Sequence, residues 1–518
     1  MVWEQEIDEL KYRRHLAEQM GGAEGIARQH SRSKLTVRER IAVLADPGSF
    51  QEIGGLAGSA TYDGDKLVAF TPANSVIGLC TLNGRKVVIS GGDFTVRGGA
   101  ADAAIGNKAA CAQKLALDWH LPYIRLLDAT GGSVRTFEQL GRTYIPDANP
   151  NCVFAGQLLG IAPVVSAVLG SVAGLPAVEA CLAHFNLMVK GISQLFPGGP
   201  PVVKAALGYD ITKEELGDER TQVYQSGVID NVVENEEEAF GMIRRFLSYM
   251  PDNVWQMPPR VEPTDDPNRR DEELLSIIPK ERNKPYNPYE ILNHVLDHDS
   301  LFEIAPLYGQ SRITALARVN GYPVGVMINN PMHLGGSMDI AAGQKAIRFL
   351  QLCDTFHLPM VYFADEPGFM VGLEAQKQGI VRAGARIVLA TCATKMPWIT
   401  CVIRQLFGVA GQNHSRPGGM FKRIAWPSGY WGSMHIEGGA VAAYRREIQA
   451  APDPEAKREE IEHRLKAIAS PFRTAEAFNI EDIIDPRDTR PILCDFIEMA
   501  QGMIKTQLGP TVGPSYWP

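Results

Sequence analysis

The sequence lacks the short patterns on which many enzyme assignments rest. None of its eight cysteines forms a C-x-x-C pair, which argues against a structural zinc site. So few thiols in 518 residues favour a reducing compartment, and we expect a cytoplasmic protein, or a mitochondrial-matrix one in a eukaryote. The chain also lacks a GxSxG nucleophile elbow, a GxxxxGK[ST] phosphate loop, an HExxH zinc motif and a GxGxxG dinucleotide fingerprint. These absences argue against the common hydrolase, nucleotide-binding and zinc-protease classes.

Positive charge and long apolar runs are also scarce. The chain has 51 Lys and Arg against 59 Asp and Glu, and a net charge of −8 argues against general nucleic-acid binding. The charged N-terminus contains no apolar run of the signal-peptide type. One uncharged stretch, 148–178, is long enough to cross a bilayer, but prolines and glycines interrupt it. We interpret it as a buried helix followed by a buried strand, and we expect no membrane span.

What the sequence does contain is an internal repeat. The segment that begins at Gly84 aligns with the segment that begins at Gly321, an offset of 237. The aligned pairs include Gly98-Gly99 with Gly335-Gly336, Lys108 with Lys345, Asp128 with Asp365, and Gly131 with Gly368. Because this period is far too long for a solenoid unit, it predicts two domains of one fold in tandem.

The organisation of the chain fits that prediction. Apolar runs alternate with helical patterns, which predicts an α/β fold with a largely parallel sheet in each domain. Eight prolines between 251 and 288 predict a linker, because proline fixes φ and removes a backbone donor. We therefore assign residues 1–255 to a first domain, 256–288 to a linker and 289–518 to a second domain. Strands are predicted at 87–90, 123–127, 164–169, 324–328, 360–364 and 398–403, and helices at 100–119 and 236–249.

The repeat continues with an offset of 234 and brings two glycine turns into register. Gly174 aligns with Gly408, and in each copy a predicted buried strand runs into the turn. Unpaired N–H groups at such a turn, with a helix dipole behind them, can stabilise a developing anion. The candidate amide pairs are Gly174 with Leu175, and Val409 with Ala410. The same glycines would also suit tight strand-to-helix packing, and the residues leave both interpretations open.

Three other groups are weaker candidates. The turn at Thr130, Gly131 and Gly132 ends a predicted strand and could face a ligand. Glu179 could act as an acid or base, although acidic residues are favoured near the start of a helix in any case, and we prefer that interpretation. The histidines at 294 and 298 flank an aspartate in an amphipathic pattern, which favours a capping or solvated role over metal binding.

Several longer motifs resemble one family. They are DFTVRGG, EELGDERTQVYQSGVID, PYNPYEIL, GGSMDIAAGQKAIRFLQLCDTFHLPM, GIVRAGARIVLA and the late GGAV. From residue 34 to at least 441, the chain resembles the carboxyltransferase (β) subunit of biotin-dependent acyl-CoA carboxylases, of the propionyl-CoA or methylcrotonyl-CoA type. The resemblance implies two crotonase-like domains, each a spiral of ββα units. It also implies a homo-hexamer built as a trimer of dimers, with acyl-CoA on the N-terminal domain of one subunit and carboxybiotin on the C-terminal domain of another.

The resemblance also implies a mechanism and a set of site residues. Carboxybiotin would release CO₂, the biotin enolate would remove the α-proton of the thioester, and the acyl enolate would attack CO₂. Each amide pair would stabilise one enolate. The residues that the resemblance assigns are Gly174 and Leu175 for the acyl enolate, Val409 and Ala410 with Gly408 on the biotin side, Gly131, Gly132 and Gln412 around the acyl group, and Arg97 for a CoA phosphate. A solvated surface role for Arg97 is the alternative.

The chain departs from the family pattern at two positions, and it lacks two motifs, a biotin-carrying hairpin and an ATP-binding loop. Leu175 and Val409 stand at positions where the family's turns usually have glycine, and they leave a non-catalytic assembly subunit as an alternative. The carboxyltransferase of a biotin-dependent decarboxylase or transcarboxylase is another. Lys395 precedes a methionine but lacks the context of a biotin-carrying hairpin, and no ATP-binding glycine loop is present. We therefore expect biotin and its carboxylase on a separate chain, and no metal.

Overall fold

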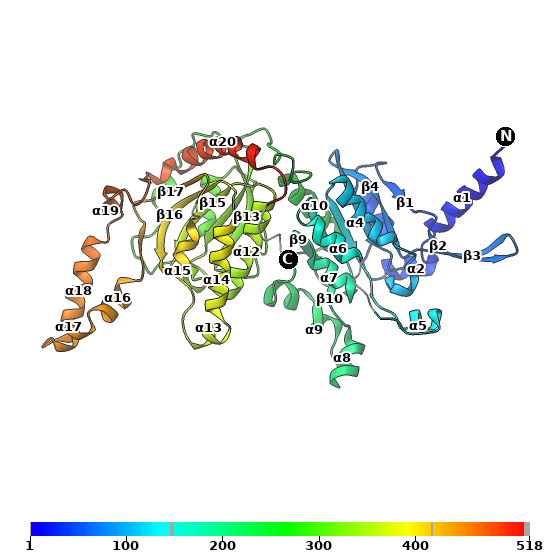
Figure 1. The fold of residues 1–518 in the computed structure, drawn as a ribbon, viewed down its shortest axis with the longest axis horizontal. Coiled ribbons are helices and arrows are strands. Elements are labelled where there is room, and N and C mark those ends of the chain that lie inside the picture. Colours follow the sequence, from blue (N-terminus) through cyan, green and yellow to red (C-terminus); the bar gives the residue numbers. More distant parts are fainter. Residues whose placement is uncertain (1, 146–149, 416–417, 512–518) are drawn as a thin grey trace. The chain divides into compact units, whose positions relative to one another are not determined.

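The chain folds into two compact units, one ending at Gln256 and the other beginning at Met257, as seen in the computed structural model (Figure 1). The structure describes residues 2–145, 150–415 and 418–511. Residues 148–149 of the uncharged stretch, and residues 416–417 and 512–518 of the predicted second domain, lie outside the described ranges. Both units are built of strands and helices around one main sheet, so the prediction of an α/β fold is confirmed.

The first unit is built on a seven-stranded sheet. The strands of this unit are β1 (Gln51–Ile53), β2 (Gly58–Asp63), β3 (Lys66–Pro72), β4 (Ser75–Leu82), β5 (Arg85–Gly92), β6 (Tyr123–Leu127), β7 (Val164–Val168), β8 (Ser171–Ala173), β9 (Phe185–Val189), β10 (Gln194–Phe196) and β11 (Asn231–Val233). The sheet order is β1-β4-β5-β6-β7-β9-β11, in which β1, β4 and β5 are antiparallel and every pair from β5 to β11 is parallel. β6, β7 and β9 are buried along their whole length, which explains their continuous apolar runs.

Helices connect and cover these strands. The helices of this unit are α1 (Glu4–Glu18), α2 (Gly22–His30), α3 (Val37–Leu44), η1 (Arg97–Gly99), η2 (Ala101–Ala103), α4 (Lys108–Trp119), α5 (Arg135–Leu140), α6 (Pro150–Leu158), α7 (Leu175–Cys181), α8 (Pro200–Leu207), α9 (Lys213–Gly217), η3 (Arg220–Gln225) and α10 (Glu236–Tyr249). α10 matches its predicted range. α4 begins eight residues later than predicted, because Gly106, with φ 50°, breaks the helical path.

The second unit repeats the architecture of the first. Its strands are β12 (Phe302–Glu303), β13 (Arg312–Val319), β14 (Tyr322–Asn329), β15 (Met360–Glu366), β16 (Trp398–Phe407), β17 (Phe421–Ala425), β18 (Tyr430–Gly432) and β19 (Asp482–Ile483). The sheet order is β12-β13-β14-β15-β16-β17-β19, with β18 beside the end of β16. Both strands of the β13–β14 hairpin have the bounds of β4 and β5 plus 237.

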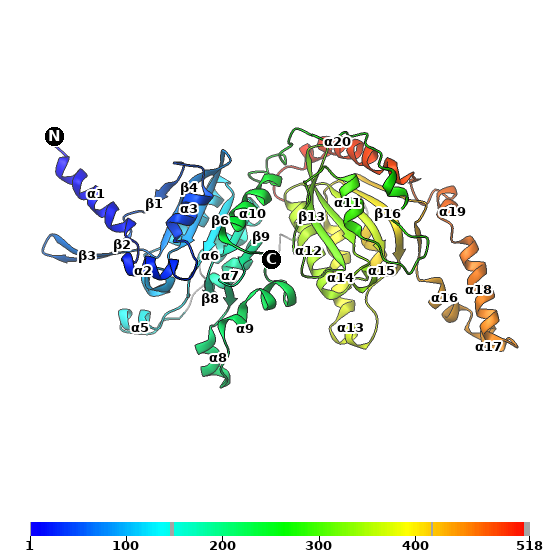
Figure 2. The same cartoon turned by 180° about the vertical axis from the view of Figure 1, so that it is seen from behind.

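A long C-terminal helix covers the second sheet. The helices of this unit are η4 (Glu272–Leu275), α11 (Pro288–Val295), η5 (Leu334–Gly336), α12 (Ile340–Thr355), α13 (Leu373–Lys377), α14 (Ile380–Ala393), α15 (Gly408–Gly411), η6 (Gln412–His414), α16 (Ile436–Ala443), α17 (Arg445–Ala450), α18 (Pro454–Ile468), α19 (Pro471–Glu476), η7 (Pro486–Asp488) and α20 (Thr489–Gln507). α20 runs along this unit, where Leu493, Phe496 and Ile497 enter the core (Figure 2). α16 to α19 project from the same unit.

The repeat predicted from the sequence is visible in individual hydrogen bonds. The N–H of Ala101 donates to the carbonyl of Gly131 at 2.8 Å, and the N–H of Met338 donates to Gly368 at 3.0 Å, 237 residues later. The change of offset also has a structural place. Tyr123 pairs with Val164, and Met360 pairs with Trp398, so the three extra residues of the first copy lie in the connection between β6 and β7.

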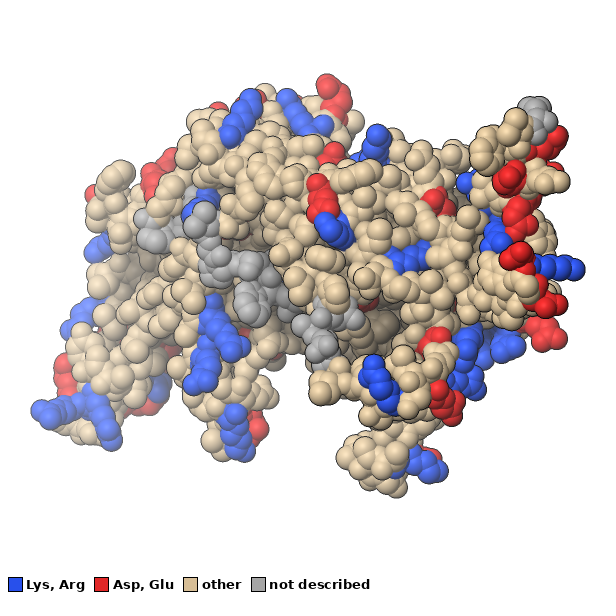
Figure 3. Space-filling model, turned by 45° about the vertical axis from the view of Figure 1, so that its right-hand side comes forward, with Lys and Arg blue, Asp and Glu red and all other residues tan. Residues whose placement is uncertain are grey.

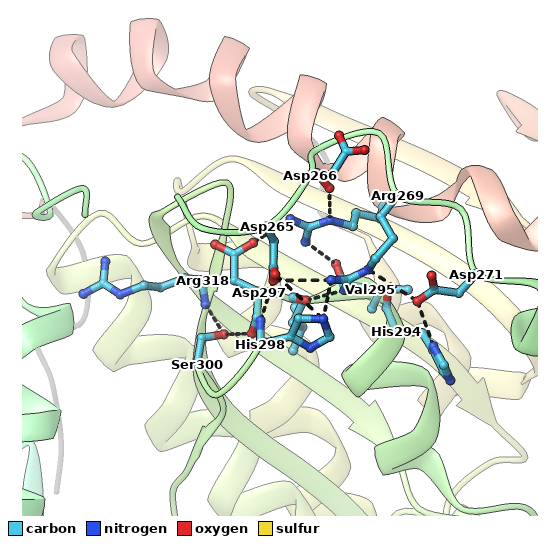
Figure 4. Close-up of polar contacts among 12 residues, drawn as sticks. Asp265, Asp266, Arg269, Asp271, His294, Val295, Asp297, His298, Ser300 and Arg318 are labelled. Atoms are coloured by element: carbon cyan, nitrogen blue, oxygen red, sulfur yellow. Dashed lines mark hydrogen bonds and ion pairs between the residues drawn. The ribbon is translucent and has the colours of Figure 1, made fainter. Parts of the chain in front are cut away.

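The proline-rich segment packs onto the second unit. Leu274 and Tyr286 belong to its hydrophobic core. Polar contacts fix the same segment to the end of α11 (Figure 4), where Arg269 donates to the carbonyl of His294 at 3.1 Å and the side chain of Asp271 contacts the His294 ring at 2.8 Å. His294 therefore helps to anchor this segment, and within the described ranges no cluster of histidine, cysteine and acidic side chains could hold a metal ion.

The uncharged stretch divides as expected. Its described part forms α6 and then the buried strand β7, and no helix in the described ranges is long and apolar enough to cross a membrane. Acidic and basic side chains are interspersed on the face shown in Figure 3. The described residues on that face form no extended basic surface of the kind that nucleic-acid binding requires.

Candidate functional site

The glycine turn of the first unit exposes one unbonded amide from its predicted pair. Gly174 has φ 69° and ends the run from β8 into α7, a conformation that favours glycine. Its N–H donates to the carbonyl of Phe196 at 3.2 Å. The N–H of Leu175, in the first turn of α7, has no acceptor in the described part of the chain, as expected at a helix start. Leu175 therefore supplies the free donor of this turn, and Gly174 supplies its shape.

A second free donor comes from the neighbouring glycine turn. Gly131 has φ 76° and lies so close to the first turn that a Cβ on it would stand 2.4 Å from the carbonyl oxygen of Ala173. A Cβ on Gly174 would stand 3.8 Å from the nitrogen of Gly132. Gly132 is exposed, and its N–H has no acceptor among the described residues. The fold thus brings the turns at 131–132 and 174–175 together, with one unbonded amide from each.

A buried ionic cluster supports this pair of turns. Asp128, at the end of β6, is fully buried and contacts the Lys34 ammonium at 2.6 Å and the Arg40 guanidinium at 3.1 Å. Arg40 also contacts Glu236 at 2.7 Å and donates to the carbonyl of Leu169 at 2.7 Å. Burial lowers the pKa of Lys34. Breaking such a buried pair costs about 3–5 kcal/mol, so the cluster fixes the strand end from which Gly131 follows.

Arg125 holds the other end of α7. Its guanidinium, inside the first unit, donates to the carbonyls of Glu179 at 3.1 Å and Leu182 at 2.6 Å, and to Gln113 at 2.9 Å. These bonds add a donor to carbonyls at the end of a short helix, where few backbone donors remain. Burial is the main cause that raises the pKa of the Glu179 carboxyl. Sequence reasoning preferred a helix-start role for Glu179, whereas the structure places its side chain in a mostly buried position.

The turn of the second unit repeats the geometry of the first. Gly408 has φ 62° and starts α15 directly after β16. Val409 is exposed and Ala410 is buried, and neither N–H has an acceptor in the described residues. Gln412 is exposed on the turn that follows. The three residues 408–410 therefore form one local amide turn, and Gln412 lies beside it.

Side chains from two other segments border this second turn. The His435 ring stacks on Phe407 with centroids 4.0 Å apart, and its Nε2 contacts the carbonyl of Pro367 at 2.8 Å. These contacts join the segments after β15, β16 and β18 at one place. His435 was not singled out from the sequence, although it lies three residues before the late GGAV motif.

A buried aspartate also supports the second turn, but with different partners. Asp365, aligned with Asp128, is fully buried and contacts the Arg404 guanidinium at 2.9 Å. The hydroxyl of Tyr286 donates to the same carboxylate at 2.9 Å. The repeat alignment contained this signal, because Asp128 and Asp365 match, but the sequence did not identify their basic partners.

Arg97 does not project freely into solvent. Its guanidinium forms an ion pair with Asp102, whose side chain is almost fully buried. The first unit contains a small cavity of about 10 Å³, which is lined by Arg38, Glu52 and Lys108 among others. A cavity of that size holds one water molecule at most. The Arg97 charge is paired locally, with Asp102.

The comparisons with known proteins agree on one family. Residues 28–507 match the carboxyl transferase domain family. The chain is 34% identical to a propionyl-CoA carboxylase carboxyltransferase subunit of Haloferax mediterranei, over 98% of both chains. It is 33% identical to the methylmalonyl-CoA carboxyltransferase 12S subunit of Propionibacterium freudenreichii subsp. shermanii, over 95% of this chain and 94% of that one.

Solved structures give the same result. A transcarboxylase 12S crystal structure, described as a hexamer with methylmalonyl-coenzyme A and methylmalonic acid bound, superposes with a TM-score of 0.87. It is 30% identical and covers 99% of this chain and 97% of its own. The expected fold, two crotonase-like domains in tandem, is confirmed. The chain therefore belongs to the carboxyl transferase family and is a carboxyltransferase of the biotin-dependent carboxylases and transcarboxylases.

Proposed function

We propose that this chain moves a carboxyl group from carboxybiotin to the α carbon, or the vinylogous γ carbon, of a short acyl-CoA that is propionyl-like or branched. The observation that carries the proposal is the pair of matched glycine turns, each with unbonded amides. Such amides stabilise charge that develops on an oxygen, because they are already oriented before the reaction.

Both steps of the proposed reaction place negative charge on an oxygen. Cleavage of the N–CO₂ bond of carboxybiotin releases CO₂ and leaves the electron pair on the biotin ureido group, where Val409 and Ala410 donate. That anion removes the α-proton of the thioester. The resulting enolate, held by the Leu175 and Gly132 amides, attacks CO₂ and forms the new C–C bond. No side-chain base is needed in this scheme, since the biotin anion accepts the proton.

A proline substitution removes one amide donor while leaving a compatible φ. Proline is well tolerated at the first position of a helix, which is where Leu175 stands. We expect Leu175→Pro to lower kcat for carboxyl transfer by about 10²–10³. Leu175→Ala, which keeps the N–H, is the matched control and should retain most activity. Equal kcat values for the two variants would remove this amide from the mechanism.

The proposed partners and alternatives follow from the relatives. We propose a separate biotin carboxylase and biotin carrier protein, and a hexameric core, because the superposing 12S transcarboxylase is described as a hexamer. A second candidate is carboxyl transfer within a decarboxylase or transcarboxylase, which the 12S relative and a 30% identical methylmalonyl-CoA decarboxylase subunit alpha of Veillonella parvula support.

One assay separates these candidates. The assembled complex is tested on a panel of acyl-CoAs with and without ATP and bicarbonate. Turnover that requires both supports the carboxylase, and transfer from a carboxylated CoA ester without ATP supports the second candidate. Absence of any turnover in an intact complex would favour a non-catalytic assembly role, which Leu175 and Val409 left open.

Two further site assignments are part of the proposal. Gln412 is exposed beside the second turn, and we propose that it contacts the acyl group. Replacing Gln412 with leucine should change the ratio of kcat/KM values across the acyl-CoA panel. For Arg97 we propose only a supporting role near the CoA phosphates, because Asp102 already neutralises its charge.

A further inference from the structure

Glu179 and Asn413 occupy equivalent positions in the two copies. They are 234 residues apart, the same offset that relates Gly174 to Gly408, and each follows its positive-φ glycine by five residues. Glu179 lies in α7 and Asn413 lies in η6, directly after α15. The surrounding residues differ between the copies, yet both copies keep a polar side chain at this position.

Both side chains contain buried polar atoms that lack a partner. Asn413 is 5% exposed, and neither its Oδ1 nor its Nδ2 has a hydrogen-bond partner among the residues that the structure describes. Within the same ranges, the buried Oε1 atom of Glu179 also lacks one. A buried polar group left unbonded costs about 1–3 kcal/mol, so these atoms do not stabilise the fold in this state. Both copies keep a polar side chain here although its unbonded atoms lower the stability of the fold. Such a side chain is suited to form its hydrogen bonds with a bound ligand.

The backbone around Asn413 prevents the carboxamide from escaping to solvent. The hydroxyl of Thr400 donates to the carbonyl of His414 at 2.6 Å, and the His414 ring contacts the carbonyl of Gly411. α14 packs beside this segment. The carboxamide is therefore held on a pinned turn that begins with the amides of Val409 and Ala410.

Glu179 is held in the same way. Arg125 bonds the backbone carbonyl of Glu179, which fixes its part of α7. Glu179 follows Leu175 by one helical turn, so the two residues lie on one face of α7. Its carboxyl bonds the Asn151 side chain and lies near the Arg125 charge. Burial raises the pKa of this carboxyl and favours the neutral form, which can donate as well as accept a hydrogen bond.

We propose that Glu179 and Asn413 are matched recognition residues for the two ligands: Glu179 hydrogen-bonds an oxygen-bearing short acyl group, and Asn413 hydrogen-bonds the cyclic urea of biotin. This inference rests on the proposed carboxyl transfer. A carboxamide presents a donor and an acceptor in one plane, which complements the N–H and C=O of a urea. A neutral carboxyl complements a hydroxyl or carbonyl on the acyl chain, and it therefore favours oxygenated over plain short acyl-CoAs.

The Asn413 arm measures reverse transfer from methylmalonyl-CoA to free biotin in the assembled complex. Asn413→Leu should raise the KM for free biotin by about tenfold or more, since one lost hydrogen bond of this kind is worth that factor. The KM for methylmalonyl-CoA should stay within about twofold. The melting temperature should stay equal or rise, because an unbonded buried amide is removed. A lower melting temperature with an unchanged KM for biotin would overturn the assignment and indicate a structural role.

The Glu179 arm compares propionyl-CoA with 3-hydroxypropionyl-CoA. Glu179→Leu should lower the ratio of kcat/KM for the hydroxylated over the plain substrate by about tenfold, whereas Glu179→Gln should retain it within about threefold. The exposed Glu237→Gln on α10 is the control for a lost carboxyl and should change nothing. An unchanged ratio in Glu179→Leu would contradict the role of Glu179.

These outcomes differ from a failure of the proposed function. If the wild-type complex transfers no carboxyl group, the proposed reaction is wrong, and calorimetric binding of free biotin and 3-hydroxypropionyl-CoA to wild type and variants then decides the recognition roles. Equal affinities of wild type and the two leucine variants for these probes would overturn the inference by themselves.

Discussion

At the scale of single residues, the site depends on glycines whose roles differ. Gly131 has a positive φ and no room for a Cβ, while the adjacent Gly132 has open space around it. Sequence reasoning selected both but could not rank them, because the distinction arises from the approach of Ala173 across the fold. The two neighbours therefore form a natural test of the turn.

Gly131→Ala should lower the free energy of unfolding by at least about 2 kcal/mol and abolish most turnover, because the new Cβ forces the two turns apart. Gly132→Ala should stay within about 0.5 kcal/mol of wild type. Urea denaturation and acyl-CoA turnover measure the two effects. Similar losses for both variants would mean that the turns are not in close contact.

Burial lowers the pKa of His414, beside the second turn, to about 4. The folded state then binds fewer protons than the unfolded state, whose histidine titrates near about 6.5. Stability is therefore complete above that pH and is lost as the pH falls toward 4, by up to about 3 kcal/mol. His414→Asn should flatten this part of the profile of unfolding free energy against pH. A profile that keeps the wild-type slope would show that His414 is not its source.

At the scale of elements, an aspartate side chain stabilises the turn of the β4–β5 hairpin, and another does the same for the β13–β14 hairpin. The Asp46 carboxylate accepts the N–H groups of Asn83 and Gly84, both at 2.8 Å. Asp297 accepts those of Asn320 at 3.1 Å and Gly321 at 2.7 Å in the second copy. The repeat alignment does not reveal that the two aspartates are equivalent. Asp46 and Asp297 are 251 residues apart, whereas the turns that they bond are 237 apart.

Asp297 has an additional partner, the fully buried guanidinium of Arg490 at 2.8 Å. Asp297→Ala should therefore lower the free energy of unfolding by about 3–5 kcal/mol, because it leaves a buried charge unpaired. Asp46→Ala removes the turn bonds and the bond to Thr81 at a partly exposed site, leaves no buried charge unpaired, and should cost clearly less. Denaturant titration of the two variants tests the order, and a larger loss for Asp46→Ala would refute this explanation.

Much of this element scale could be predicted from sequence. Buried strands such as β6 have continuous apolar runs, and α10 combines an asparagine cap with a regular apolar face, so both have their predicted bounds. The start of α4 was wrong, since positive φ at Gly106 was not visible. The partners of Asp128 and Asp365 could not be predicted either, because they depend on contacts between segments distant in sequence.

At the scale of the whole molecule, the two units have separate cores. The buried cluster around Arg40 lies entirely in the first unit, and the cluster around Arg404 lies in the second. The limits 1–255, 256–288 and 289–518 stay a prediction as domain boundaries. The proline-rich segment contributes core residues to the second unit, so its role as a free linker has no support in its contacts.

Arg40→Met should lower the stability of the first unit by about 3–5 kcal/mol, because Asp128 and Glu236 lose their common partner. The second unit should be unaffected. Hydrogen exchange measured by mass spectrometry reports protection for each unit separately, and faster exchange should be confined to residues before Gln256. Equal acceleration in both units would show that they unfold together.

The three-residue difference between the copies has a consequence for how this architecture can change. It falls wholly in the connection between β6 and β7, which carries the turn at Gly131 and Gly132, and β6 pairs with β7 in parallel as β15 pairs with β16. Insertions at this point can therefore lengthen the connection that carries the Gly131 turn while the parallel strands β6 and β7 stay in register. If the two units arose by duplication of one domain, this connection is a place where their lengths could diverge at little cost in stability. Directed evolution of acyl preference can start at the same connection.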